Sequence, residues 1–390
     1  MNDVRKLFPR VALVADQMTA FGGADREMFS ILKVFPEADI FTIVFDKEKY
    51  PKFTNTVYSS SVGKLSRFLP RGFYRHLKLL TPIVYENIDL SGYDLVISIS
   101  AGPGKGIITG IDQPHLAMVM TPPRSLWDNE LNIRGSKLRF IYRGLSYGIN
   151  TYMRVWDYST SKRVDYWSAN SRFIKKKIKK VYGQNARVIY PGVEEKYFEG
   201  VGIKKIKEVK DKYTLPDEFF LVVSRLYDYK RIDWAIKSCI KAKKCLYIVG
   251  DGPDKNYLEK MSKGHKNIHF LGYLKNDDDV IAFYALSQAL LFCGVEDFGY
   301  TPVEAMASGT PIIAYKYGGV LETVKEGLTG EFFTEESELV SALMNFDKTR
   351  YNSENIKKHA RLFSEECFIH NFEEYLKEIY ECEKRKKEKY

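Results

Sequence analysis

The chain has 390 residues, of which 45% are hydrophobic and 28% are charged. This length accommodates two domains, and the absence of any low-complexity block excludes a fibrous or largely disordered protein. The formal net charge of +10 favours a negatively charged partner, such as an anionic membrane surface or a nucleic acid.

The sequence contains no segment typical of a membrane span or a metal site. A span would need about 20 consecutive apolar residues, and the N-terminal apolar run is also too short for a signal peptide. The five cysteines form no Cys-x-x-Cys pair, and His265 and His269 have no cysteine near them. We therefore expect a reduced, cytoplasmic protein without a bound metal or other cofactor.

Short apolar strands alternate with helical stretches along the whole chain. Most are continuous apolar runs, as expected of parallel strands that are buried on both faces. The expected strands cover residues 11–15, 40–45, 95–99, 116–121, 166–169, 188–190, 220–224, 246–249, 268–272, 289–293 and 311–315. This alternation predicts an α/β protein with two Rossmann-like, doubly wound sheets.

The boundary between the two predicted domains follows residues 188–198. There the apolar pattern stops, and a lysine-rich connector (202–212) leads into the next sheet. From about residue 364 a final helix carries apolar residues at helical spacing, and the last residues form a charged end.

The stretch 296–319 is the most informative part of the sequence. Glu296 follows an apolar strand, and Glu304 lies on a short helix expected over 302–308, which Gly309 ends. A helix that starts beyond a strand end offers backbone N–H groups to phosphate or sugar oxygens, here from Gly299, Tyr300 and Thr301. Two carboxylates beside such a turn can accept hydrogen bonds from the hydroxyls of one ligand.

Other strand ends of the second half carry groups suited to a nucleotide. Arg225 and Lys230 follow the strand 220–224, where a guanidinium and an ammonium could clamp a diphosphate. The loops that contain Gly252 and Leu274 follow the next two strands, and their backbone could approach a nucleotide. The acidic run 277–279 is better explained as the N-cap and first turn of a helix than as a metal site.

The first half provides a second glycine loop and a possible acceptor loop. Gly22 and Gly23 precede a helix expected over 24–35, where the backbone and the helix dipole favour an anion. In residues 115–128, Arg124, Trp127 and Asp128 are candidates for binding an acceptor. For Trp127 and Asp128, an aromatic packing residue with a local cap is an equally good interpretation.

Together these motifs resemble the signature of the retaining GT-B glycosyltransferases of the group 1 (family four) type. The residues 115–128 look most like mannosyltransferases of surface polysaccharide assembly, whose histidine before Thr-Pro is Met120 here. A thioether can neither donate a hydrogen bond nor titrate, so any role of that histidine is absent or moved to Arg124. The resemblance implies an acceptor domain over 1–198 that is completed by the helix 364–390, and a donor domain over 199–363 that faces it across a cleft.

The resemblance implies a metal-independent hexosyltransferase that retains the anomeric configuration. Arg225 and Lys230 would neutralise the leaving diphosphate, Glu296 would bind the transferred sugar, and Glu304 would bind the ribose. GDP-mannose is the expected donor, with UDP-glucose or UDP-N-acetylglucosamine next, and the acceptor is a glycan or a lipid-linked glycan. A nucleotide-sugar epimerase, a phosphorylase of the same fold, or a non-catalytic basic binder remains an alternative.

Two basic amphipathic segments bear on location. Residues 64–80 combine bulky apolar residues with Arg67, Arg71 and Arg75, and favour peripheral association with an anionic membrane. For residues 172–183 we expect instead an ordinary helix with one face in the core. A nucleic-acid partner is disfavoured because no recognised nucleic-acid-binding motif accompanies the charge.

Overall fold

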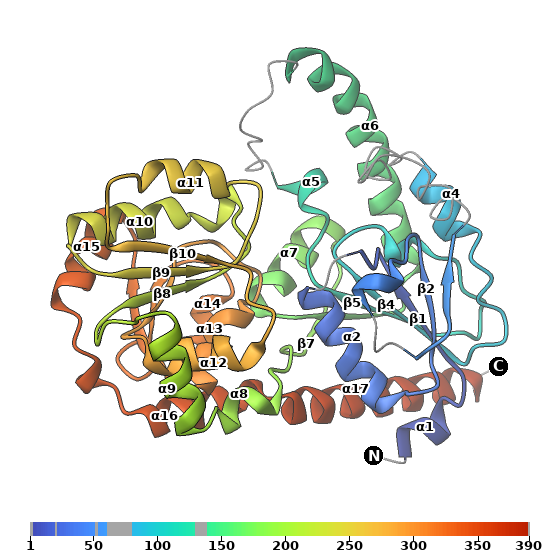
Figure 1. Cartoon of the computed structure of the whole chain (residues 1–390). Coiled ribbons are helices and arrows are strands. Elements are labelled where there is room, and N and C mark those ends of the chain that lie inside the picture. The colour runs from blue at the N-terminus through green and yellow to red at the C-terminus, as the bar shows by residue number, and fades with distance from the viewer. Residues whose placement is uncertain (1–2, 20–21, 51–53, 61–79, 129–138, 389–390) are drawn as a thin grey trace. The chain divides into compact units, whose positions relative to one another are not determined.

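The computed structural model describes residues 3–19, 22–50, 54–60, 80–128 and 139–388. The chain divides into two compact units, of which unit 1 is Met1–Tyr190 with Phe368–Tyr390 and unit 2 is Pro191–Cys367 (Figure 1). The acceptor and donor roles expected for the two domains, and the domain boundaries that go with those roles, remain predictions. Among the described residues, no helix has both the length and the apolar character needed to cross a bilayer.

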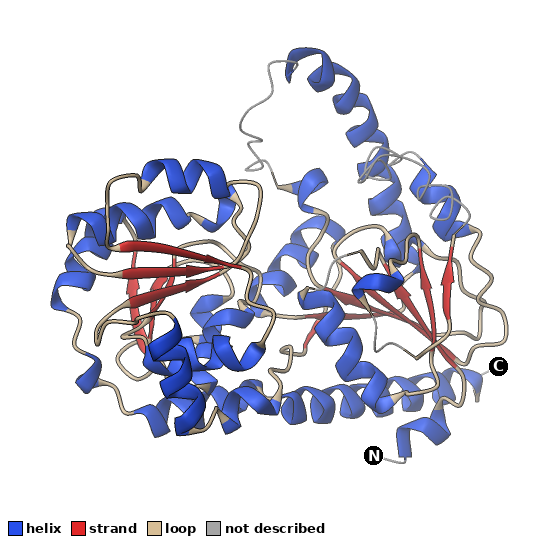
Figure 2. Cartoon of the chain, in the orientation of Figure 1, coloured by secondary structure: helices blue, strands red, loops and turns tan. Residues whose placement is uncertain are grey.

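Unit 1 contains a seven-stranded, all-parallel sheet with the strand order β3-β2-β1-β4-β5-β6-β7. Its strands are β1 (Val11–Ala15), β2 (Asp39–Thr42), β3 (Val57–Ser59), β4 (Leu95–Ser100), β5 (His115–Val119), β6 (Tyr166–Ala169) and β7 (Arg187–Val188). All residues of β1, β4 and β5 are buried, because helices cover both faces of the sheet (Figure 2).

Side chains along the central strand β1 point alternately to the two faces of the sheet, so the core of unit 1 has two layers. Leu13 lies opposite Ile40 and Ile97 and packs on one side with α2 and α17, whereas Ala12 and Val14 pack on the other side. The helices are α1 (Asp3–Leu7), α2 (Gly23–Val34), α4 (Thr81–Glu86), α5 (Arg124–Trp127), α6 (Arg139–Thr160), α7 (Arg172–Tyr182) and α17 (Glu365–Lys387), with the short turns η1 (Lys47–Lys49), η4 (Gly104–Gly106) and η5 (Ser161–Arg163).

Unit 2 contains a six-stranded parallel sheet with the order β10-β9-β8-β11-β12-β13. Its strands are β8 (Phe220–Val223), β9 (Leu246–Val249), β10 (Ile268–Gly272), β11 (Leu290–Phe292), β12 (Ile312–Tyr315) and β13 (Gly330–Phe333). The helices are α8 (Glu195–Glu199), α9 (Ile203–Lys212), α10 (Ile232–Lys241), α11 (Lys255–Met261), α12 (Asp277–Leu286), α13 (Tyr300–Ala307), α14 (Val320–Thr323), α15 (Glu336–Asn345) and α16 (Ser353–Ala360), with η6 (Asp228–Lys230), η7 (Lys348–Arg350) and η8 (Arg361–Phe363).

The last helix, α17, begins in unit 2 and continues into unit 1. Its apolar residues recur on one face, and Phe368, Phe372, Leu376 and Ile379 are buried in the core beside α2. The helix is therefore a structural part of unit 1, although about 180 residues of unit 2 separate it from the rest of that unit in sequence.

Several details differ from the sequence-based expectation. The edge strands β3 and β13 were not predicted, because neither shows a continuous apolar run and β3 is only half-buried. Helix α13 begins at Tyr300 instead of residue 302. The N-cap of α12 is Asn276, whose side chain accepts from the backbone N–H of Asp278 at 3.0 Å, so the acidic run forms the first turn without providing the cap.

The prediction for residues 172–183 is confirmed, since α7 buries Ile174, Ile178 and Tyr182 in a core cluster.

Candidate functional site

Both sheets have a topological switch point, where the direction of the strand connections reverses. In unit 1 this point lies between β1 and β4, and in unit 2 between β8 and β11. Ligands of open parallel sheets bind beyond the carboxyl ends of the strands at such a point. The predicted site residues of unit 2 all follow the carboxyl ends of β8 to β11.

Lys230 and Glu296 meet at the switch point of unit 2. Lys230 ends η6, just after β8, and Glu296 follows β11. The Lys230 ammonium forms an ion pair with the Glu296 carboxylate and lies 5.1 Å from the centre of the Tyr229 ring. The side chains of the pair are 13% and 19% exposed. The structure therefore brings together the predicted phosphate-binding cation and the predicted sugar-binding carboxylate.

Glycines allow the loops around this ion pair to approach closely. A Cβ on Gly294 would lie 2.7 Å from Lys230 Cα, so the end of β11 packs directly against the backbone of η6. A Cβ on Gly319 would lie 2.2 Å from the carbonyl oxygen of Asp297, and the Gly319 N–H donates to the Glu296 carbonyl at 2.9 Å. These contacts fix the backbone on both sides of the pair.

The neighbouring strand-end loops are tied to each other in the same way. Arg225 follows β8 with an exposed side chain, and its guanidinium lies 5.6 Å from the centre of the Tyr227 ring. Gly252 follows β9, and a Cβ there would lie 2.4 Å from the carbonyl oxygen of Leu226. Leu274 follows β10 and is half-buried. The structure thus places Arg225, Gly252 and Leu274 beyond the carboxyl ends of three neighbouring strands.

Helix α13 places the second glutamate. Its N-cap, Gly299, has φ of +90°, a left-handed conformation that favours glycine, and Tyr300 and Thr301 form its half-buried first turn. Glu304 is 3% exposed, and its Oε2 accepts a hydrogen bond from the Tyr284 hydroxyl at 2.9 Å. A ligand-facing role for Glu304 stays a prediction.

In unit 1 the glycine loop is hydrogen-bonded to the first turn of the helix that follows it. The Gly22 N–H donates to Asp25 Oδ2 at 2.8 Å, and the Tyr50 hydroxyl donates to Asp25 Oδ1 at 2.7 Å. Burial raises the pKa of Asp25, and these two hydrogen bonds oppose that rise. Gly23 is the first residue of α2. Gly22 and Gly23 lie on unit 1, whereas the other predicted donor-binding residues lie on unit 2.

The predicted acceptor residues lie on or next to α5 in unit 1. Arg124 begins this four-residue helix and is half-buried. The Trp127 indole N–H donates to Asp157 Oδ2 at 2.7 Å, and the Asp128 carboxylate is paired with Lys177 at 3.1 Å. These polar groups of Trp127 and Asp128 therefore have partners within unit 1, and acceptor binding by them stays a prediction.

The contacts that organise the switch point of unit 1 were not predicted from the sequence. Asp16, directly after β1, accepts from the backbone N–H groups of Ala101 and Gly104, each at 2.7 Å, and from Ser100 Oγ at 3.0 Å. Asp157 forms an ion pair with Lys105, which lies in the same loop as Ala101 and Gly104. These partners are far apart in sequence, so no local pattern could have identified them.

Comparisons with known proteins agree with this architecture. Residues 204–363 match the family model described as glycosyl transferases group 1. The chain is 28% identical over 224 residues to the alpha-monoglucosyldiacylglycerol synthase of Acholeplasma laidlawii, which covers 52% of this chain and 54% of the synthase. It is 25% identical over 213 residues to the D-rhamnosyltransferase WbpZ of Pseudomonas aeruginosa, which covers 53% of each. The chain spans about half the length of the curated relatives it matches.

Similarity to solved structures extends over nearly the whole chain. The crystal structure of Anabaena HepE in complex with UDP-glucose matches with a TM-score of 0.68 at 18% identity, covering 94% of this chain and 99% of HepE. At this identity the likeness shows the fold alone. The chain therefore has the GT-B fold, and its residues 204–363 match the glycosyl transferases group 1 model.

Proposed function

We propose that this protein is a retaining hexosyltransferase that transfers a sugar from a nucleoside diphosphate donor to a glycan or lipid-linked acceptor. The observation that carries the proposal is the Lys230–Glu296 ion pair at the switch point of the group 1 domain. A cation for the diphosphate and a carboxylate for the sugar hydroxyls are the two groups that such a donor requires at one place.

The ion pair also suggests how the donor would be recognised. A diphosphate carries more negative charge than one carboxylate, so its arrival would draw the Lys230 ammonium toward the phosphates. Glu296 would then be free to accept hydrogen bonds from the transferred sugar. With Arg225, the ammonium would stabilise the charge that develops on the leaving diphosphate, while Glu304 would hold the ribose. In this proposal the cationic side chains take the place of a divalent metal ion.

Variants at the two cations test the proposal. Arg225→Ala and Lys230→Ala should each lower donor binding or transfer at least roughly tenfold, about 1.4 kcal/mol. Lys237→Ala is the matched control, since Lys237 is ion-paired with Asp233 on the same unit but lies on α10. Activity should survive EDTA. Near-wild-type kinetics in both cation variants would refute the assignment, and activity that EDTA abolishes and a divalent ion restores would refute metal independence.

GDP-mannose is our proposed donor, on the basis of the motif around Arg124 and the stretch 296–319. A UDP-sugar is the second candidate, because a matched structure is HepE with UDP-glucose and a relative is a glucosyldiacylglycerol synthase. A thermal-shift panel of nucleotides separates them, since a ligand at 100 times its dissociation constant adds about 2.7 kcal/mol of stability. Stabilisation by UDP but not by GDP would overturn the mannose donor and leave the transferase intact. Reaction products would identify an epimerase or a phosphorylase.

We also propose peripheral association with an anionic membrane, where a lipid-linked acceptor would be found. The basic segment 64–80 lies outside the described residues except for Leu80. Leu80 and Ile83, at the start of α4, are 38% and 60% exposed, and Tyr152 and Val155 on α6 are 50% and 65% exposed. Trp156 of α6 donates to Glu86 of α4 at 2.9 Å, so these two helices with exposed apolar side chains are neighbours.

Liposome co-sedimentation tests the membrane proposal. The triple change of Arg67, Arg71 and Arg75 to glutamate should abolish binding to anionic vesicles at low salt, because each basic residue near such a surface contributes about 1 kcal/mol. The control is the same charge reversal at three lysines of unit 2, namely Lys241, Lys243 and Lys244. A wild-type protein that ignores anionic vesicles would make a soluble acceptor the better proposal.

A further inference from the structure

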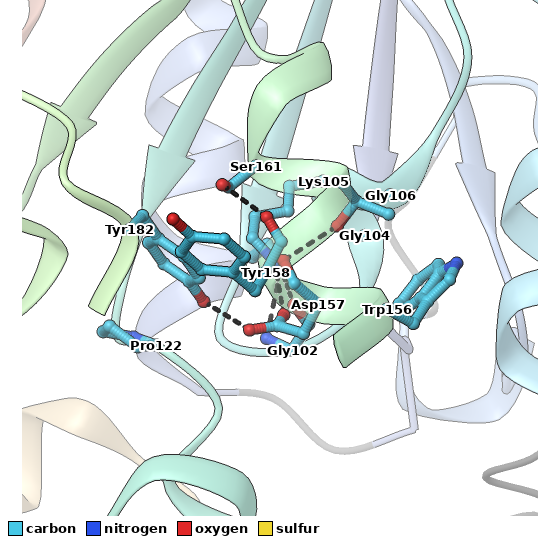
Figure 3. Close-up of polar contacts among 12 residues, drawn as sticks. Gly102, Gly104, Lys105, Gly106, Pro122, Trp156, Asp157, Tyr158, Ser161 and Tyr182 are labelled. Atoms are coloured by element: carbon cyan, nitrogen blue, oxygen red, sulfur yellow. Dashed lines mark hydrogen bonds and ion pairs between the residues drawn. The ribbon is translucent and has the colours of Figure 1, made fainter. Parts of the chain in front are cut away.

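A lysine and an aspartate form a fully buried ion pair in unit 1. Lys105 lies in η4, just beyond β4, and Asp157 lies near the end of α6 (Figure 3). Each residue is 1% exposed, and the Lys105 ammonium is ion-paired with Asp157 Oδ1. The same ammonium lies 4.9 Å from the centre of the Tyr182 ring. Lys105 is thus held in the interior by one carboxylate and one aromatic face.

The other oxygen of this carboxylate connects two further elements. Asp157 Oδ2 accepts from Trp127 Nε1 at 2.7 Å and from the Tyr182 hydroxyl at 2.8 Å. Trp127 ends α5, and Tyr182 ends α7. Burial, and after it the Asp157 charge, raises the pKa of Tyr182 well above its usual value, so the tyrosine is a neutral donor. Asp157 therefore joins α5, α7 and the loop after β4.

The loop that carries Lys105 is itself fixed in place. Asp16 accepts from the Gly104 N–H, and Arg163 Nη1 donates to the Gly106 carbonyl at 3.0 Å. A Cβ on Gly106 would lie 2.4 Å from the Trp156 ring, so the loop packs tightly against α6. The backbone around Lys105 is therefore already ordered, so its ion pair with Asp157 costs little further conformational entropy.

Stability alone does not account for such a pair. The cost of removing both charges from water offsets most of their attraction, and apolar residues of similar volume often stabilise a core equally well. Helix α5, by contrast, depends on external contacts, since four residues cannot form a stable helix alone and its N-cap, Pro123, makes no side-chain capping bond. The Trp127–Asp157 hydrogen bond is one such contact, and the Arg154 guanidinium donates another to the Leu126 carbonyl at 3.3 Å.

We infer that Lys105 and Asp157 are positioning residues that hold α5, and with it Arg124, in the orientation needed to bind the acceptor. Lys105 fixes the Asp157 carboxylate, Asp157 fixes the Trp127 indole, and Trp127 fixes the C-terminal end of the helix that Arg124 begins. The acceptor part of this inference rests on the proposed transferase function. The structural part, which is the dependence of α5 on the buried pair, does not.

Trp127→Phe tests the critical link, because it keeps an aromatic ring and removes only the N–H donor. We expect hydrogen exchange of the amides in residues 124–128 to accelerate at least tenfold. The ratio kcat/KM for octyl glucoside as acceptor probe should fall at least tenfold, while stabilisation by the donor nucleotide stays at the wild-type level. Tyr182→Phe is the matched control, since it removes the other hydrogen bond to the same carboxylate oxygen and keeps the ring that packs edge-on against Trp127. It should change neither measurement.

Lys105→Met extends the test through a double-mutant cycle. It should give the same acceptor defect as Trp127→Phe, and the double variant Lys105→Met/Trp127→Phe should be no worse than either single variant, because both act through one contact. Unchanged exchange in Trp127→Phe, or an equal acceleration in Tyr182→Phe, overturns the inference even if Lys105→Met does not fold. If the wild type transfers nothing to any acceptor, the proposed function fails, and the exchange data still decide whether the pair positions α5.

Discussion

Glu27 should make the stability of unit 1 fall as the pH rises. This glutamate lies on α2 and is 3% exposed, and among the described residues its Oε2 has no hydrogen-bond partner. Burial raises the pKa of Glu27 from 4.5 to about 8. Desolvation disfavours the charged form, so the folded protein keeps this carboxyl protonated at neutral pH.

The size of the effect follows from proton linkage. Below pH 4.5 the carboxyl is neutral in both the folded and the unfolded states. Between pH 4.5 and about 8 only the unfolded state is ionised, so each pH unit removes about 1.4 kcal/mol from the free energy of unfolding. Over the whole window the loss approaches roughly 5 kcal/mol as an upper limit, because the unfolded state binds fewer protons than the folded state. Glu27→Gln, which cannot ionise, should remove this loss.

Urea unfolding at pH 5, 7 and 8.5 measures the prediction. Three of the four tryptophans, Trp127, Trp156 and Trp167, lie in unit 1, so their fluorescence follows mainly its unfolding. Relative to the wild type, Glu27→Gln should gain several kcal/mol in stability between pH 5 and pH 8.5. Glu37→Gln removes a charge from an exposed position and should leave the pH profile unchanged. Parallel profiles of wild type and Glu27→Gln would refute the reasoning.

Three further outcomes are expected from the structure. Gly106→Ala should destabilise unit 1 by about 1–3 kcal/mol in urea unfolding because its Cβ would collide with Trp156, whereas Gly110→Ala, with no heavy atom nearer than 3.9 Å, should be nearly neutral. Burial lowers the pKa of His115 from 6.5 to about 3, so stability should be lost as the pH falls through that window, and His115→Gln should flatten the acid limb of the unfolding profile. Lys230→Met should keep the thermal midpoint of the free protein within a few degrees. In a thermal-shift titration it should at least halve the stabilisation by the donor nucleotide at 100 times the wild-type dissociation constant, from about 2.7 to about 1.4 kcal/mol, because affinity falls at least roughly tenfold.

The buried strands were predictable because a strand that is buried on both faces consists mostly of apolar residues. The strand β1 is a continuous apolar run, and its neighbour β4 departs from such a run only at Ser98 and Ser100. The positions of both strands agree with the expectation within a residue. The edge strands β3 and β13 have partners on one side only and show no such run, so pairing in the sheet decides their structure. The acceptor and donor roles of the units are properties of bound ligands and stay predictions.

The places of Lys230 and Glu296 in the fold were predictable from the sequence, but their pairing was not. Lys230 and Glu296 each follow a buried strand, and parallel topology puts both strand ends at one edge of the sheet. Their ion pair depends on the close approach of Gly294 to the η6 backbone, which no sequence periodicity encodes. Asp157 gave no signal at all, because its partners Lys105 and Trp127 are separated from it by 52 and 30 residues.

The two lysine–carboxylate ion pairs differ in how deeply they are buried, and this difference supports a different role for each. The Lys230–Glu296 pair is 13% and 19% exposed, so both side chains keep an edge that water and ligand oxygens can reach. The Lys105–Asp157 pair is 1% exposed on both sides, and separating it would leave an uncompensated charge in the interior, which costs about 3–5 kcal/mol. In our proposal the first pair opens for a diphosphate, whereas the second acts by staying closed. This difference is the physical reason for assigning ligand binding to Lys230 and positioning to Lys105, although both lysines follow a strand at the switch point of their sheet.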